Sequence, residues 1–326
     1  MIITAWSALS PYGTEDQAFA EGTTARRPLP DKPRPVPDFE PREYLGRQGT
    51  RTMGRATALS IAAATRLLTE DVDPTRTGLV LGTTNGSAQS ILEVNRASRE
   101  RKSPHHVQPS SIQNATMNSI AGQTAIWHGL QGPNATLAGG TTTGLLALGY
   151  CRRLLLTGRA DVLLAGAVEE LSEARTWVRS GTAPLAEGCA LVRLEADATG
   201  GLAEVLAVTS LVVTDGDTKT AVRRAAERVL DRASPGQVWA TMGSGTWEDA
   251  ESTALTTVCP QATPLPPVTE TVGQLHSAAG AFQLVTALTR AAVSGPGDRV
   301  VLLTSVEHQG IVAAAVVRIK GENVVA

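Results

Sequence analysis

The chain has 326 residues, enough for two average domains or for one large duplicated fold. Its formal net charge of −2 and the absence of long like-charge runs argue against nucleic acid or a membrane surface as a partner. Three cysteines without a C-x-x-C pair, no signal-peptide pattern in MIITAWSALSPYG and no membrane-length apolar run lead us to expect a cytoplasmic protein with neither disulfides nor a metal site.

Helices and buried strands alternate along the first half of the chain. Arg55–Leu68 is predicted as a helix because its apolar residues recur at helical spacing. Gly144–Leu156 is predicted as a second apolar helix, closed by Gly158. The almost wholly apolar segment Ala160–Gly166 indicates a strand buried on both faces. Two further short strands are expected at Met1–Ser7 and Gly78–Gly82.

The second half repeats this alternation. Helices are predicted at Lys219–Arg232 and Ala278–Ser294. Strands are predicted at Glu187–Leu194, Ala203–Val213, Val238–Met242, Arg299–Ser305 and Val312–Ile319. The pattern indicates an α/β fold with central sheets covered by helices. We expect one half over residues 1–174, a linker over 175–185 and a second half over 186–326, with another irregular segment at Pro28–Pro41.

The segment Asn118–Glu170 (NSIAGQTAIWHGLQGPNATLAGGTTTGLLALGYCRRLLLTGRADVLLAGAVEE) resembles the core of β-ketoacyl synthases. The positions in register with that family are Asn118, Gly122, Gly132, Pro133, Asn134, Gly158, Asp161 and Gly166. GLVLGTTNGS, EGCALVRLE and GQLHSAAG extend the match over most of the chain. The resemblance implies a thiolase-like fold, in which two duplicated α/β halves form layers in the order α-β-α-β-α. It implies no cofactor.

The resemblance also shows which catalytic groups this chain lacks. The family's thiolate stands at a strand-to-helix elbow, where a helix N-terminus lowers its pKa and backbone N–H groups hold the oxyanion. Thr141 occupies that position, Met242 and Gln274 occupy the two histidine positions, and Thr269 replaces an upstream lysine. The glycine-rich loop that supplies an oxyanion donor becomes Val306–Gly310 (VEHQG). These changes remove every role that the mechanism requires, so we expect no catalytic residue.

This combination resembles the chain-length factor, the β subunit of type II polyketide ketosynthases, which has lost its cysteine. Its second-histidine motif is close to Gly273–Gly280 (GQLHSAAG), in which His276 occupies a non-catalytic position. The usual chain-length factor carries glutamine rather than threonine at the cysteine position, and it is longer. The shortened chain resembles those of highly reducing, polyene-forming systems. The expected partners are an active ketosynthase, an acyl carrier protein reached through that ketosynthase, and a polyketide or polyene acyl chain.

Two other functions stay open. In the first, Thr141 is the nucleophile of a divergent acyltransferase or hydrolase acting on an acyl thioester; this needs an adjacent base to activate the hydroxyl. In the second, the chain is a homodimeric acyl-binding protein without chemistry.

The resemblance also predicts the interface and the tunnel. We expect the strand Asn134–Gly140, with Leu137, and the helix Ser110–Ile120 to form the dimer contact. At helical spacing this helix places four residues on one face that lines the partner's acyl tunnel: Gln113, Thr116, Met117 and Ile120.

Overall fold

A computed structural model of the chain describes residues 1–70, 72–178 and 183–321, in which ten strands form a continuous sheet. The strand order is β3-β2-β4-β5-β1-β6-β10-β9-β7-β8. The strands are β1 (Ile2–Leu9), β2 (Thr77–Gly82), β3 (Asn134–Leu137), β4 (Val162–Glu169), β5 (Gly188–Glu195), β6 (Ala203–Val212), β7 (Ala240–Met242), β8 (Thr263–Pro264), β9 (Arg299–Glu307) and β10 (Ile311–Ile319). The helices are α1 (Asp16–Thr24), α2 (Pro41–Leu45), α3 (Arg55–Thr65), α4 (Ala88–Glu100), α5 (Pro109–Asn114), α6 (Ser119–His128), α7 (Thr143–Leu156), α8 (Glu173–Trp177), α9 (Thr218–Ala233), α10 (Glu248–Val258), α11 (Val268–Thr271) and α12 (Ala279–Ala292), with 3-10 turns η1 (Pro104–His106), η2 (Gly140–Thr142) and η3 (His276–Ala278).

The two halves of the sheet have the same topology. The series β1-α3-β2-α6-β3-α7-β4-β5 is followed by the equivalent series β6-α9-β7-α10-β8-α12-β9-β10. From the middle of the sheet outward, both halves place their strands in the same order. They join where Ile2 pairs with Glu204 and Ile3 with Ala203. The predicted duplication is confirmed.

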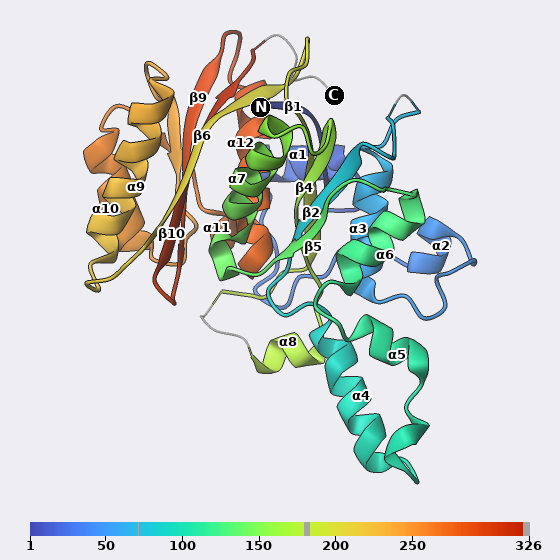
Figure 1. The fold of residues 1–326 in the computed structure, drawn as a ribbon. Coiled ribbons are helices and arrows are strands. Elements are labelled where there is room, and N and C mark those ends of the chain that lie inside the picture. The colour runs from blue at the N-terminus through green and yellow to red at the C-terminus, as the bar shows by residue number, and fades with distance from the viewer. Residues whose placement is uncertain (71, 179–182, 322–326) are drawn as a thin grey trace.

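Helices cover both outer faces of the sheet and fill the space between its halves. Figure 1 shows α7 and α12 in the middle, α3 and α6 outside one half, and α9 and α10 outside the other. The central core joins apolar side chains of α7 and α12 to those of both sheet halves, and a separate core lies under each outer helical layer. This is the predicted α-β-α-β-α layering.

One predicted strand belongs to the other half. The segment that opens the expected second half forms β5, which pairs antiparallel with β1 and β4 of the first half. Sequence order does not show this pairing, because β5 is an almost wholly apolar strand that either half could bury. We propose that the boundary between the halves lies between Glu195 and Ala203.

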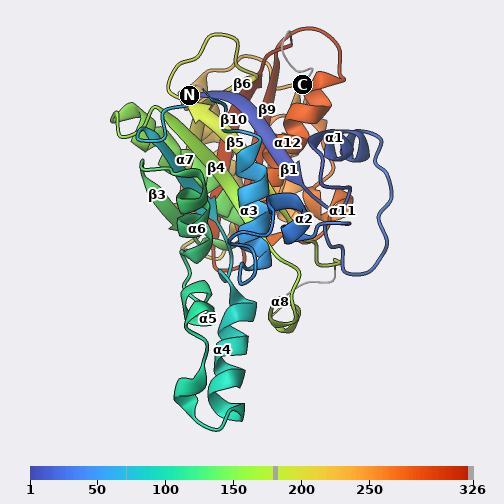
Figure 2. The ribbon, with the colours of Figure 1, turned by 90° about the vertical axis from the view of Figure 1, so that its right-hand side faces the viewer.

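An arm formed by α4, η1 and α5 projects from the body (Figures 1 and 2). The prediction of a continuous helix over Ser110–Ile120 is wrong. α5 ends at Asn114, and α6 begins at Ser119 after a break. The four residues expected on one helical face are therefore divided between two helices and the turn that joins them.

The expected linker over residues 175–185 is partly helical, since α8 extends to Trp177. Residues 179–182 of that linker lie outside the described part of the chain. Within the described residues, no helix is both long and apolar enough to cross a membrane.

Candidate functional site

The turn that leads into α7 holds Thr141, which stands where the resemblance places the nucleophilic cysteine. Its side chain is buried in η2. The preceding residue, Gly140, has a φ of 56°, a left-handed conformation that glycine adopts readily. The turn therefore forms an elbow at a helix N-terminus, where backbone N–H groups favour an anion.

A carboxylate of the same chain occupies this elbow. Glu307, the last residue of β9, places its Oε2 2.7 Å from the backbone N of Thr141 and 3.0 Å from the Thr141 Oγ1. Its Oε1 accepts a hydrogen bond of 3.0 Å from the backbone N–H of His308. A Cβ on Gly140 would collide with the carboxylate, so glycine at this position leaves room for it.

The Thr141 hydroxyl has one proton and two acceptors. Its Oγ1 lies 2.5 Å from the carbonyl oxygen of Val306 and 3.0 Å from Oε2 of Glu307. A carboxylate beside a hydroxyl is one arrangement that can activate a nucleophile. However, Oε2 of Glu307 also accepts from the backbone N–H of Thr141. Acyl transfer would need that N–H to stabilise the developing oxyanion. These contacts therefore oppose use of Thr141 as a nucleophile.

A buried polar network lies behind the elbow. Glu169 Oε1 accepts hydrogen bonds from the backbone N–H of Thr84, at 2.8 Å, and from the Ser277 hydroxyl. Arg175 Nε lies 3.6 Å from Oε2 of Glu169, and the Arg175 guanidinium donates to Nδ1 of His276 at 3.2 Å. An accepting Nδ1 leaves the ring proton on Nε2. Burial lowers the pKa of His276, as does the charge of Arg175, so the neutral ring is favoured.

The two positions that the resemblance equates with the family's histidines hold a methionine and a glutamine. Met242 ends β7, and its side chain is fully buried in the central core. Gln274 precedes η3, and its backbone carbonyl oxygen accepts from the backbone N–H of Ala186 at 3.0 Å and from Arg175 at 2.9 Å. A thioether and an amide have no titration near neutral pH. Among the described residues, no cluster of histidine, cysteine and carboxylate side chains is arranged to hold a metal ion.

The contact between Glu307 and Thr141 is the feature that the sequence did not reveal. The available signal was the acid at position 307, within the segment 306–310 that the resemblance equates with the family's glycine-rich oxyanion loop. The sequence motif gives His276 a non-catalytic position, yet its ring lies in the network behind the elbow. Its φ of 43° is unusual for a residue with a side chain.

The residues predicted to line a tunnel do not lie together. Met117 lines an open hollow of about 620 Å³ between the arm and α8. Ile120 is buried in the core under α3 and α6, whereas Gln113 and Thr116 are exposed. Leu137 lines a different hollow, of about 430 Å³, beside α7 and β6. The other residues of the first hollow are mainly apolar: Asn85, Ala88, Ile91, Leu92, Asn95, Ala115, Ala174, Trp177 and Val178.

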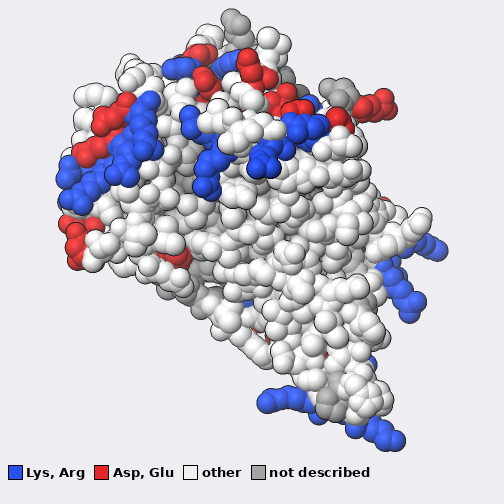
Figure 3. Space-filling view, viewed as in Figure 1, with Lys and Arg blue, Asp and Glu red and all other residues white. Residues whose placement is uncertain are grey.

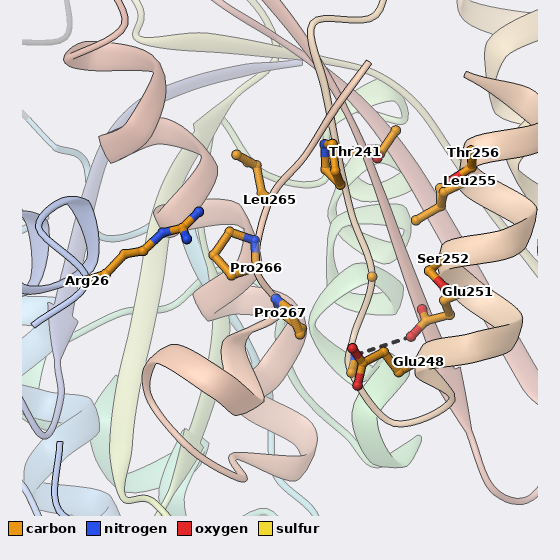
Figure 4. A pocket seen from close by; sticks show the side chains of 13 residues that line it. Arg26, Thr241, Glu248, Glu251, Ser252, Leu255, Thr256, Leu265, Pro266 and Pro267 are labelled. Atoms are coloured by element: carbon orange, nitrogen blue, oxygen red, sulfur yellow. Dashed lines mark hydrogen bonds between the residues drawn. The ribbon is translucent and has the colours of Figure 1, made fainter. Parts of the chain in front are cut away.

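A third hollow, of about 310 Å³, lies between α10 and the loop after β8 (Figure 4). Arg26 extends toward it from one side, and Glu248 and Glu251 lie on the other. Burial raises the pKa of Glu251 to about 7. Its carboxylate accepts bonds from the Ser244 backbone and hydroxyl, the Gly245 backbone and the Thr304 hydroxyl, so it holds the turn after β7 in place.

Comparison with known proteins fits this geometry. A family model described as "Beta-ketoacyl synthase, N-terminal domain" matches residues 45–196. The solved structure "The ishigamide ketosynthase/chain length factor" is 35% identical with a TM-score of 0.89, over 98% of this chain and 99% of that chain. A type II polyketide ketosynthase solved in complex with its acyl carrier protein (AntDE:AntF) has a TM-score of 0.83 at 19% identity, over 98% of this chain and 99% of that one, and supports the fold.

The curated relatives match a smaller part of the chain. The 3-oxoacyl-[acyl-carrier-protein] synthase 2 of Vibrio harveyi is 29% identical over 143 residues, which cover 42% of this chain and 34% of that protein. The chain thus matches about a third of the length of this relative.

The duplicated halves, the layered sheet and the elbow at the start of α7 define a protein of thiolase-like fold. Within that fold the chain belongs to the β-ketoacyl synthase family, and it is similar over 98% of its length to a ketosynthase/chain-length-factor structure.

Proposed function

We propose that the chain is a non-catalytic, chain-length-factor-like subunit of a type II polyketide synthase. It forms a heterodimer with an active ketosynthase and helps to shape the tunnel for the growing acyl chain. The acyl carrier protein acts through that partner. The observation that carries the proposal is the occupation of the elbow: the N–H of Thr141 binds Glu307, and no thiol is present there.

The edges of the sheet support dimerisation through β3. β3 is the end strand of the first half and pairs with β2 along one side. The opposite end strand, β8, has two residues and is followed by Pro266 and Pro267. Proline and short length protect an edge from pairing, whereas an open edge favours addition of another strand. The asymmetry of the two edges favours a partner at β3.

The face that carries β3 suits a protein interface. Figure 3 views the molecule from the same direction as Figure 1. Figure 2, which is turned by 90°, shows that β3, α7 and the arm lie toward the side of the molecule that faces the viewer in Figure 3. In Figure 3 the charged side chains gather along the upper rim, at the left and right edges and at the tip of the arm, while the broad area between them carries few charges. Depletion of charge is typical of the centre of an interface. The apolar hollow lined by Met117 opens on the arm.

Co-purification tests the proposal. The chain is co-expressed with the active ketosynthase of the same system, and only one of the two carries an affinity tag. We expect a stoichiometric complex on size exclusion, and we expect chain elongation by the complex to depend on the partner's cysteine. Elution of the two proteins as separate species at micromolar concentration would contradict the heterodimer.

The acyltransferase is a second candidate because Oε2 of Glu307 lies 3.0 Å from Oγ1 of Thr141, within reach of a general base, although the same Oε2 also occupies the N–H of Thr141. This function predicts a covalent acyl group on Thr141. Incubation of the isolated chain with acyl-carrier substrate, followed by intact-mass analysis, distinguishes the two. An adduct that is lost in Thr141→Val would establish the acyltransferase.

A further inference from the structure

We propose that Glu307 is a built-in occupant of the elbow, whose carboxylate fills the anion position at Thr141 and closes the elbow to acyl groups independently of the missing thiol. The inference concerns the isolated chain and goes beyond the proposed function, because it holds whether or not a partner is bound. It implies that restoring a cysteine at residue 141 does not by itself restore a reactive elbow.

The contact crosses from one half of the fold to the other. Glu307 ends β9 in the second half, and Thr141 belongs to η2 of the first half. A second bond parallels it, because the Ser305 hydroxyl donates to the carbonyl oxygen of Thr141 at 2.8 Å. β9 and η2 are thus joined by hydrogen bonds at both Ser305 and Glu307. An acyl group could enter only if the carboxylate left its donors.

The donors around the carboxylate form an anion cradle. Oε2 accepts a hydrogen bond from the backbone N–H of Thr141, and Oε1 accepts one from that of His308. Gly140 has no side chain, so the space that the carboxylate occupies is not blocked. Backbone N–H groups at a helix N-terminus are a common anion-binding arrangement. A tetrahedral intermediate would need the same N–H of Thr141 for its oxyanion. Carboxylate and oxyanion therefore compete for one donor.

The charge of Glu307 also acts on any ionisable side chain at residue 141. Other groups near the elbow are His308 beside it, His276 from η3, and Glu169 from β4. Glu169 lies close to the cation of Arg175 and accepts from hydroxyl and backbone donors, whereas Glu307 faces residue 141 directly. A neighbouring negative charge raises the pKa of a thiol, in opposition to the helix N-terminus.

The test introduces the thiol as a probe. Thr141→Cys and Thr141→Cys/Glu307→Gln are made in a Cys259→Ser background, because the other two cysteines are fully buried. Glutamine keeps the size of the side chain and an oxygen acceptor, so the double variant differs mainly in charge. Iodoacetamide is the probe: the thiolate forms an S–C bond and displaces iodide, and intact mass gives the rate at each pH.

We expect the thiol pKa of the double variant to fall by about one unit or more relative to Thr141→Cys, which corresponds to a roughly tenfold larger thiolate fraction at pH 7 and therefore to faster alkylation. Thr141→Cys/Glu204→Gln is the matched control, since Glu204 is a surface carboxylate paired with Arg318. It should behave as Thr141→Cys does. Equal thiol pKa values and rates with and without Glu307 would overturn the proposal.

A second measurement covers the case in which the double variant does not fold. Glu307→Ala alone leaves the cradle empty, and a small carboxylate from solution should then fill it. We expect sodium acetate to raise the Tm of Glu307→Ala above the value in sodium chloride of equal ionic strength, and to give no such difference in the unsubstituted chain. The same acetate response in both proteins would show that the cradle does not bind a carboxylate, and the proposal would fail.

Discussion

Gly144 of α7 and Gly280 at the start of α12 pack directly against each other. A Cβ on Gly144 would lie 2.8 Å from the Cα of Gly280 and 2.4 Å from the backbone N of Ala281. The two helices that begin at η2 and η3 can therefore cross closely only because neither side chain intervenes. The same crossing brings the elbow at Thr141 close to the network around Ser277.

This packing predicts the effect of adding one methyl group. Gly144→Ala places its Cβ against backbone atoms that cannot move independently, and we expect a loss of about 1–3 kcal/mol in the free energy of unfolding. Gly149→Ala, in the same helix, is the control. Its Cβ would lie 3.5 Å from Val208, an ordinary contact, so the higher helix propensity of alanine should leave stability unchanged or slightly higher. Equal effects in urea unfolding would contradict the close crossing.

The raised pKa of Glu251 predicts a pH dependence of stability. The folded chain raises this pKa to about 7 from the usual 4.5, so the folded state binds the proton more tightly than the unfolded state. Stability is therefore highest below about pH 4.5 for this group and falls as pH rises toward 7, by about 3 kcal/mol at most. We expect Glu251→Gln to remove this contribution, so that the free energy of unfolding from urea titrations changes less between pH 5 and pH 8 than in the unsubstituted chain.

The control for this pH dependence lies in the same helix. Glu248 is an exposed carboxylate on α10, so Glu248→Gln changes the charge without changing a buried site. It should retain the pH profile of the unsubstituted chain. If Glu248→Gln and Glu251→Gln gave the same profile, burial of Glu251 would not be the cause.

The long periodic segments could be predicted from the sequence. The helix expected at Arg55–Leu68 forms α3 from Arg55 to Thr65, and the one expected at Ala278–Ser294 forms α12 from Ala279 to Ala292. Each buries a wide apolar face, so its spacing shows in the sequence. The duplication of the fold could also be predicted, because strands and helices alternate in both halves of the sequence.

The contacts between distant segments could not be predicted in this way. Glu307 and Thr141 are 166 positions apart in the sequence. No local sequence pattern indicates that the Glu307 carboxylate occupies the turn that holds Thr141. The sequence of β5 predicts a buried strand, but it does not indicate with which half of the sheet that strand pairs. The break between α5 and α6 is also set by context, since residues 115–118 contain no proline or glycine.

The proposed interface leads to a proline test on β3. The carbonyl oxygens of Pro133 and Leu137 accept hydrogen bonds from the β2 side. Backbone groups alternate along a strand, so those of Asn134 and Thr136 point to the open edge. Leu137→Pro would therefore break the chain's own sheet, and Thr136→Pro is the sharper test. We expect Thr136→Pro to abolish the heterodimer on size exclusion, because proline removes a donor at the open edge.

Thr136→Val is the matched control, because it keeps the backbone N–H and the shape of the side chain. The Oγ1 of Thr136 is buried without a hydrogen-bond partner among the described residues, so we expect its loss to be tolerated. A full-strength heterodimer from Thr136→Pro, with unchanged circular dichroism, would place the interface elsewhere.

The last prediction concerns the length of the acyl chain. Met117 lines the apolar hollow on the arm and is 44% exposed, whereas its neighbour Thr116 lies outside the hollow's lining. If the hollow forms part of the tunnel in the heterodimer, Met117→Trp should fill it and shift the products to shorter chains without separating the subunits. Thr116→Trp adds a side chain of the same size one position away, and we expect it to leave the product length unchanged. Reconstitution with the active ketosynthase and mass spectrometry of the products compares the two variants. An unchanged product length from an intact Met117→Trp heterodimer would show that this hollow does not measure the chain, and a shift from Thr116→Trp alone would assign that role to the exposed side of the turn.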